Sequence, residues 1–144
     1  MREEKISNEN VKKQLDLFFD WYDIDIDFVF NIGEDGTNAA NSMLYTGIKT
    51  GRIEIRTEDV AGGGTTIVIE QDLDHPINGE RKIKYYEATA ATHISSRPGK
   101  NVSEDARIFD FLSVLSKKEL GDLTEMRGAD IRYARLIGCL FLAV

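Results

Sequence analysis

The sequence predicts an α+β domain with a mainly antiparallel sheet and two helices packed on one face. Three patterns predict this fold: an amphipathic helix near the start, alternating strands separated by turn residues in the middle, and a second amphipathic helix late in the chain. The chain has 144 residues, of which 42% are hydrophobic and 30% are charged, as is ordinary for a globular protein. We therefore expect a single domain over residues 1–144.

The first predicted element is a helix over residues 7–22. Ser7 is a suitable N-cap, and Ile6 and Val11 have the spacing of a hydrophobic staple across it. Apolar side chains then recur at intervals of four, three and four residues: Val11, Leu15, Phe18 and Tyr22. A single apolar stripe of this kind allows the helix to pack on a sheet.

Residues 24–30 alternate between apolar and mostly acidic side chains, which predicts a half-buried strand. One face of this strand would carry Asp23, Asp25 and Asp27. Carboxylates supply the oxygen ligands that divalent cations prefer, but such a site normally gathers ligands from several elements and the sequence shows no converging partner. We therefore expect a solvated acidic face and no bound metal.

The middle of the chain is predicted to contain a long loop followed by a hairpin. Residues 33–51 are rich in glycine and asparagine, which favours a loop, and residues 38–45 could hold a short helix within it. The hairpin strands are residues 52–56, which alternate, and residues 65–70, which are rich in β-branched side chains. A phosphate-binding loop would need a lysine and a helix after Gly62–Gly64, so we interpret these glycines as the hairpin tip.

Three further elements follow the hairpin. A turn over residues 72–79 leads into a long predicted strand over residues 81–96. A second helix is predicted over residues 103–118, with Asn101 or Ser103 as its cap.

The chain closes with an apolar run over residues 136–144. Nine residues are too few to span a bilayer, so we expect no membrane anchor. We expect instead a final strand that begins near Asp130 and is buried in the domain or at a subunit interface. Cys139 is the one cysteine of the chain, which excludes an internal disulfide, and its apolar surroundings predict a buried thiol.

The two histidines lack the partners that catalysis would need. His75 lies in an Asp-His-Pro turn, where adjacent side chains point in different directions. His93 and Ser95 form half of the signature of two-histidine phosphoesterases, and the sequence lacks the second half. No pair of residues has a credible nucleophile–base or acid–base spacing. We therefore expect no catalytic residues, no cofactor and no enzymatic activity.

A basic cluster around the start of the second helix is the candidate ligand site. Arg97, Lys100 and Arg107 could hold an anion such as phosphate, form salt bridges to a neighbouring subunit, or remain solvated. Tyr85 or Tyr86 would stack on the base of a nucleotide. The net charge of −7 opposes general or sequence-specific binding to nucleic acids. Sequestering a small nucleotide signal is thus one possible function.

The order of the predicted elements resembles that of tail-terminator and neck proteins of tailed bacteriophages. Members of that group start with an amphipathic helix, continue through antiparallel strands, place a helix late and close with a strand. The segments that carry the resemblance cover about half of the chain: Asn8–Tyr22, Arg81–Ser96, Ser103–Lys118 and Tyr133–Val144.

The resemblance implies a non-enzymatic structural protein that forms an oligomeric ring at the tail or head–tail junction of a phage-like particle. Its partners would be further copies of itself and other virion proteins, such as the tail tube or connector. Asp23, Asp25 and Asp27 could then line a lumen that repels DNA phosphates. Because the N-terminal residues show no secretory signal, we expect assembly in a host cytoplasm and a final location in the virion.

Overall fold

The computed structural model describes residues 2–24, 39–95 and 103–143. In this part of the chain, a three-stranded antiparallel sheet with strand order β1-β2-β3 packs against helices, which confirms the predicted α+β fold. The helices and strands have these bounds: α1 Asn8–Trp21, α3 Ala39–Lys49, β1 Ile53–Asp59, β2 Thr65–Ile77, β3 Glu80–Tyr86, α4 Ala90–Ser95, α5 Glu104–Ser116, α6 Leu120–Leu123 and α7 Ala129–Ala143.

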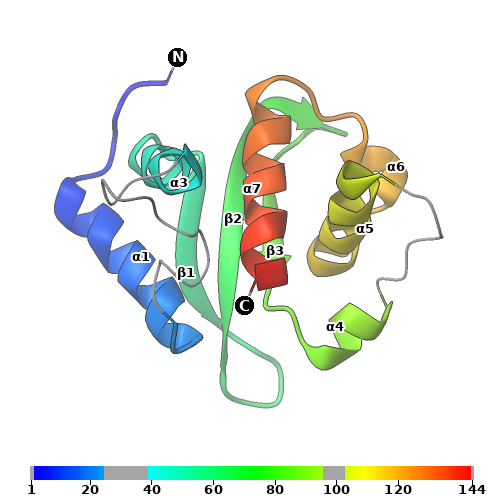
Figure 1. Ribbon diagram of the computed structural model, residues 1–144, viewed down its shortest axis with the longest axis horizontal. Coiled ribbons are helices and arrows are strands. Elements are labelled where there is room, and N and C mark those ends of the chain that lie inside the picture. The colour runs from blue at the N-terminus through cyan, green and yellow to red at the C-terminus, as the bar shows by residue number, and fades with distance from the viewer. Residues whose placement is uncertain (1, 25–38, 96–102, 144) are drawn as a thin grey trace.

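Figure 1 shows how the helices lie relative to the sheet. Helix α7 runs in front of the middle of the sheet, α1 and α3 lie on the β1 side, and α5 and α6 lie on the β3 side. Contacts join α1 and α3 to β1, α7 to β2 and α5 to β3. In the described part of the chain, four helices therefore contact the sheet where the sequence predicted two.

Both predicted amphipathic helices are confirmed, together with their caps. The hydroxyl of Ser7 accepts a hydrogen bond from the Asn10 N–H at 3.2 Å, and the hydroxyl of Ser103 accepts one from the Ala106 N–H at 3.1 Å. Each hydroxyl satisfies a backbone donor that the first helical turn leaves without a partner. Helix α5 ends at Lys117, which adopts a left-handed conformation.

The predicted hairpin is confirmed as β1 and β2, which pair from Ile53 opposite Gln71 to Asp59 opposite Thr65. The predicted turn over residues 72–79 is shorter than expected. Strand β2 continues through an irregularity to Ile77, and the chain turns at Asn78 and Gly79, both with positive φ.

The long strand predicted over residues 81–96 is correct only as far as Tyr86. Residues 90–95 form helix α4, which places His93 on a helix. The Thr89 hydroxyl accepts a hydrogen bond from the Thr92 N–H at 3.2 Å, as a helix cap does. The period-two pattern therefore breaks where a threonine cap precedes the helix-forming pair Ala90 and Ala91.

The predicted final strand is wrong, because residues 129–143 form helix α7. The buried side chains repeat with helical spacing: Tyr133, Ala134, Leu136, Ile137, Leu140 and Phe141. The prediction of a buried thiol is also wrong, since Cys139 lies between these positions and is exposed. The apolar end of the chain is covered by packing on β2 and α5 rather than by strand pairing.

Two predictions concern the region around residues 24–51. The short helix predicted over residues 38–45 is present and longer, as α3. Most of the strand predicted over residues 24–30 lies outside the described residues. Asp23 lies in the turn that ends α1, where its φ is 53°.

Helix α7 approaches its neighbours closely at two glycines. A Cβ atom at Gly47 of α3 would lie 2.7 Å from a ring carbon of Tyr133, and one at Gly138 of α7 would lie 2.6 Å from a methyl carbon of Ile108. Real Cβ atoms essentially never make such short contacts. The two glycines therefore set the distance at which α3, α7 and α5 pack.

The outer edge of β1 is partly covered. The side-chain oxygen of Gln14 on α1 accepts a hydrogen bond from the Ile55 N–H at 2.8 Å. Covering an edge in this way removes a site where a foreign strand could pair. Within the described residues, no helix is long and apolar enough to cross a membrane.

Candidate functional site

A buried polar chain fixes the start of α7 to the sheet. Asp130 is 1% exposed, and its carboxylate accepts hydrogen bonds from the Asp74 and His75 N–H groups at 2.8 and 2.9 Å. Its backbone oxygen accepts one from the Gln71 side-chain amide at 2.9 Å. The Tyr85 hydroxyl donates to the same Gln71 side chain at 2.8 Å. Every one of these groups has a hydrogen-bond partner within the protein, so this series of hydrogen bonds has a structural role.

The position of Tyr85 rules out the stacking role that the sequence suggested for it. The residue is 0% exposed, and burial followed by the nearby charge of Asp130 raises the pKa of its hydroxyl. Tyr85 therefore stays protonated as a hydrogen-bond donor to Gln71, and its ring is not available to a base. Tyr86 is half-buried, and the Lys117 ammonium lies 5.1 Å from the centre of its ring in a cation–π contact.

The remaining candidate residues do not form a ligand site in the part of the chain that the structure describes. Arg107 is exposed on α5, while Arg97 and Lys100 lie outside the described residues. Of the predicted acidic row, Asp25 and Asp27 also lie outside them. No group of three or more metal-ligating side chains is found within residues 2–24, 39–95 and 103–143.

One face of the sheet carries six ion-paired side chains together with Val68 and Tyr86, and we call it the charged face. The six ion-paired residues are Glu54, Arg56, Glu58, Glu70, Lys82 and Lys84. Arg56 contacts Glu54, Glu58 and Glu70 at 3.2, 2.7 and 3.0 Å. Lys82 lies 3.7 Å from Glu70, and Lys84 lies 3.0 Å from Glu58. Hydrogen bonds from Lys84 and then Arg56 lower the pKa of the Glu58 carboxyl.

A second ion-pair group joins the N-terminal segment to β2. Arg2 lies 3.2 Å from Asp72 and 2.8 Å from Asp74, and Arg52 lies 2.8 Å from Asp74. Arg81 pairs with Asp72 at 2.7 Å. Partial burial acts to raise the pKa of Asp74, but hydrogen bonds from Arg52 and Arg2 outweigh it and lower that pKa. The charges of this group are therefore engaged in holding the fold.

An apolar hollow opens where α5, α6 and α7 meet, and we call it the α5–α7 hollow. It has a volume of about 200 Å³ and is lined by Phe109, Leu123, Thr124, Met126 and Ile131. Phe109 and Ile131 are only half-buried, so apolar atoms of both helices remain accessible to water.

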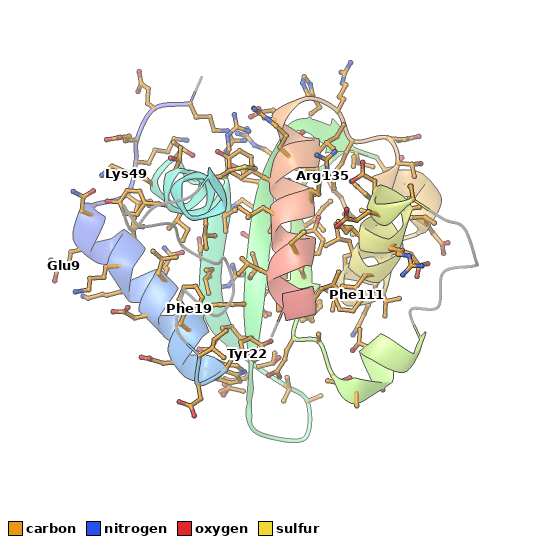
Figure 2. All side chains as sticks on the ribbon, viewed as in Figure 1. Glu9, Phe19, Tyr22, Lys49, Phe111 and Arg135 are labelled. Atoms are coloured by element: carbon orange, nitrogen blue, oxygen red, sulfur yellow. The ribbon has the colours of Figure 1, made fainter. Side chains whose placement is uncertain are left out.

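Charged residues of both signs flank the lining of this hollow in the sequence. Exposed Arg127 and Arg132 follow Met126 and Ile131, while exposed Glu125 precedes Met126 and Asp122 precedes Leu123. Arg135, which Figure 2 shows between α7 and α5, pairs with Asp105 at 3.0 Å. The hollow thus has an apolar lining with mixed charge around it.

A wider hollow, of about 580 Å³, lies along α1 and is lined in part by Leu15, Phe19, Ile24 and Tyr45. Its lining also includes the charged side chains of Lys12, Asp16 and Asp20. The α5–α7 hollow, by contrast, is lined by four apolar side chains and one threonine. We therefore take the α5–α7 hollow as the candidate functional site.

Sequence reasoning did not find this hollow, because its lining comes from three separate elements. One feature of the sequence did point to an accessible apolar surface on α5. Helix α5 carries aromatic residues on both flanks of its apolar stripe, and Phe109 is on the flank that stays accessible. Comparisons with models of protein families, with curated proteins and with solved structures find no match for this chain.

Proposed function

We propose that this protein is a non-enzymatic assembly protein that works by binding other proteins. The observation that carries the proposal is the α5–α7 hollow, an apolar concavity with half-buried Phe109 and Ile131 open to water. Accessible apolar surface of this kind is typical of interaction sites, because covering it releases water at little electrostatic cost.

Three apolar side chains outside the hollow are also exposed, as is ordinary for a folded protein. Val60, Leu120 and Leu142 are 41%, 40% and 44% exposed. The charges on the sheet and around Arg2, by contrast, contact each other within the chain.

The specific form that we propose is an oligomeric ring in the tail or neck of a phage-like particle. Support for it is the element order that the sequence shares with tail-terminator and neck proteins. The opening helix, the antiparallel strands and the late helix α5 agree with that order. Two of the four segments depart from it: residues 90–95 form helix α4 within the strand expected over 81–96, and the closing segment is helix α7 where those proteins have a strand.

Nucleotide binding has less support than assembly. Of its two candidate stacking residues, Tyr85 is buried and Tyr86 is half-buried with the Lys117 ammonium over its ring. A thermal-shift screen against cyclic and linear nucleotides separates the two functions. We expect no ligand-dependent rise in melting temperature, and a rise that disappears in the Arg107→Ala variant would favour the nucleotide binder.

The assembly proposal is tested by measuring the mass of the purified protein in solution. Light scattering coupled to size-exclusion chromatography, over a dilution series in the micromolar range, should show a defined oligomer. Negative-stain electron microscopy should show closed rings. A strict monomer throughout the series would contradict the ring, and a rise in mass without a plateau would contradict closure.

A further inference from the structure

We propose that the N-terminal segment, residues 2–6, is a strap that holds the first turn of α7 in place, so that the strap and this turn open together. The link between them is the end of β2, where Asp74 binds the strap with its side chain and α7 with its backbone. Folded proteins open locally in cooperative units of this kind. The strap lies within one copy of the chain, so it does not depend on the proposed ring.

The start of the strap is bound to β2 by the side chain of Arg2. This side chain is 11% exposed. It donates a hydrogen bond to the Asp74 carboxylate at 2.9 Å, and it donates to the carboxylate and the backbone oxygen of Asp72 at 3.2 and 3.0 Å. Three hydrogen bonds from one guanidinium fix its position more firmly than a single exposed ion pair would.

The other end of the strap is bound to α3. The N–H groups of Lys5 and Ile6 donate to the backbone oxygen of Lys49 at 2.8 and 3.1 Å. Lys49 is the last residue of α3, where helical carbonyls otherwise lack a partner. Figure 1 shows this segment passing beside α3 before α1 begins. The strap therefore joins α3 to β2, and both of these elements contact α7.

The backbone of β2 carries this attachment on to α7. The N–H groups of Asp74 and His75 donate to the Asp130 carboxylate at 2.8 and 2.9 Å. Asp130 is 1% exposed, so water does not readily replace these bonds. When the strap releases the side chain of Asp74, it therefore loosens the same backbone to which the first turn of α7 is bound.

Arg52 makes a second link between these elements. Its guanidinium lies 2.8 Å from the Asp74 carboxylate and 5.3 Å from the centre of the Tyr133 ring on α7. Arg2 and Arg52 thus hold the same carboxylate, one from the strap and the other from beside α7. The strap, the end of β2 and the first turn of α7 are joined by contacts that share this one residue.

The first turn of α7 also forms a wall of the α5–α7 hollow. Ile131, which lines the hollow, follows Asp130 directly, and its N–H donates to the Gly128 oxygen at 3.2 Å. Opening of this turn moves Ile131, so the strap controls the shape of the hollow through α7. High salt should favour the open form, because Asp72 and Asp74 are 17% and 32% exposed and their pairs with Arg2 are partly screened.

The first test follows amide hydrogen exchange in the full-length protein, with single amides resolved by mass spectrometry. Arg2→Ala should raise the exchange rates of the Asp74, His75 and Tyr133 amides about tenfold, because it removes charged hydrogen bonds that oppose opening. The amides of α5 should keep their rates. An unchanged rate at Tyr133, or an equal rise throughout α5, would contradict a local unit formed by the strap and α7.

Arg81→Ala is the matched control. Arg81 pairs with Asp72 at 2.7 Å, as Arg2 does, but it belongs to β3 and not to the strap. Its loss removes the same charge from the same group and should change the exchange rate of Tyr133 about twofold or less. An acceleration equal to that in Arg2→Ala would show that the charge near Asp72 controls α7, and it would overturn the role of the strap.

The second test starts from the other end of the link. Asp130→Asn weakens the bonds between β2 and α7, and it should raise the exchange rates of the Lys5 and Ile6 amides, because coupling between two sites is reciprocal. Rates that stay at the wild-type values would show that the strap and α7 open independently, and they would overturn the proposal. The exchange rates are compared within one oligomeric state, so failure here would leave the proposed function standing.

Discussion

The two faces of the sheet use alternate residues of the same strands and differ sharply in chemistry. Along β2, Ile67, Ile69 and Leu73 are fully buried on the face covered by helices. Glu70, between them in the sequence, lies on the charged face and pairs with Arg56. The period-two pattern of one strand thus supplies an apolar core on one face and ion pairs on the other, where Val68 is also fully buried.

This difference teaches where the stability of the fold comes from. Each buried aliphatic side chain contributes about 1.5–3 kcal/mol, whereas an exposed ion pair contributes about 0–1 kcal/mol. The covered face therefore supplies most of the free energy of folding. The charged face keeps the sheet hydrated and disfavours stacking on another sheet. Four predictions test this division, beginning with the largest expected effect.

Two neighbouring residues of β2 compare the faces directly. Ile69→Ala should lower the free energy of unfolding by about 2–5 kcal/mol, because it opens a cavity under the helices. Val68→Ala should cost about 1–2 kcal/mol, because the flexible side chains opposite it, Arg56 and Tyr86, can close over the gap. Urea unfolding measures both. An equal loss would show that the charged face is packed as tightly as the covered one.

The buried polar chain is expected to have the next largest effect. Asp130→Ala leaves the Asp74 and His75 N–H groups without their acceptor, which should cost about 2–3 kcal/mol. Asp130→Asn keeps one acceptor oxygen and should cost less. Chemical denaturation of the two variants checks the order, and equal stability of Asp130→Ala and wild type would mean that water replaces the carboxylate.

The close approach of α7 to α5 predicts a smaller change with a matched control. Gly138→Ala places a Cβ atom against Ile108, so we expect a loss of about 1–2 kcal/mol despite the better helix propensity of alanine. Gly121→Ala on α6 meets nothing within 4 Å and should gain about 0.4–1 kcal/mol. Opposite signs in thermal unfolding would confirm that packing, and not helix propensity, decides the outcome at Gly138.

The charged face should show the smallest effect and a dependence on pH. The pKa of Glu58 is lowered from 4.5, so its ion pairs stabilise the fold above that pH and are lost as pH falls through the lowered pKa. Arg56→Gln should cost about 1 kcal/mol or less at neutral pH and should reduce the loss of stability in acid. Melting temperatures of both proteins between neutral and acidic pH measure this, and parallel curves would contradict it.

Local signals in the sequence were sufficient to predict α1, α5 and the hairpin. Ser7 and Ser103 supply caps directly before apolar stripes, and Gly62–Gly64 marks the turn between two β-rich segments. These elements are specified by neighbouring residues, so their prediction does not require knowledge of the tertiary structure.

The closing helix was wrongly predicted as a strand. Its apolar run contains isoleucine, phenylalanine and cysteine, which occur readily in buried strands. Its length and the helical spacing of its apolar residues distinguish a helix from a strand, and both depend on including Asp130 and Tyr133 in the same element. The α5–α7 hollow depends on this helix, which is why the candidate site was beyond the reach of the sequence.

The single exposed cysteine on α7 has a practical consequence for studying assembly. Cys139 is the one thiol among the 144 residues, so a fluorophore or spin label attaches at one known position without removing other cysteines. Although the residue is exposed, partial desolvation of its sulfur and then the nearby Glu104 raise the pKa of this thiol, so coupling with a maleimide should proceed faster at mildly alkaline pH. Distances between labels on different copies would then test the proposed assembly.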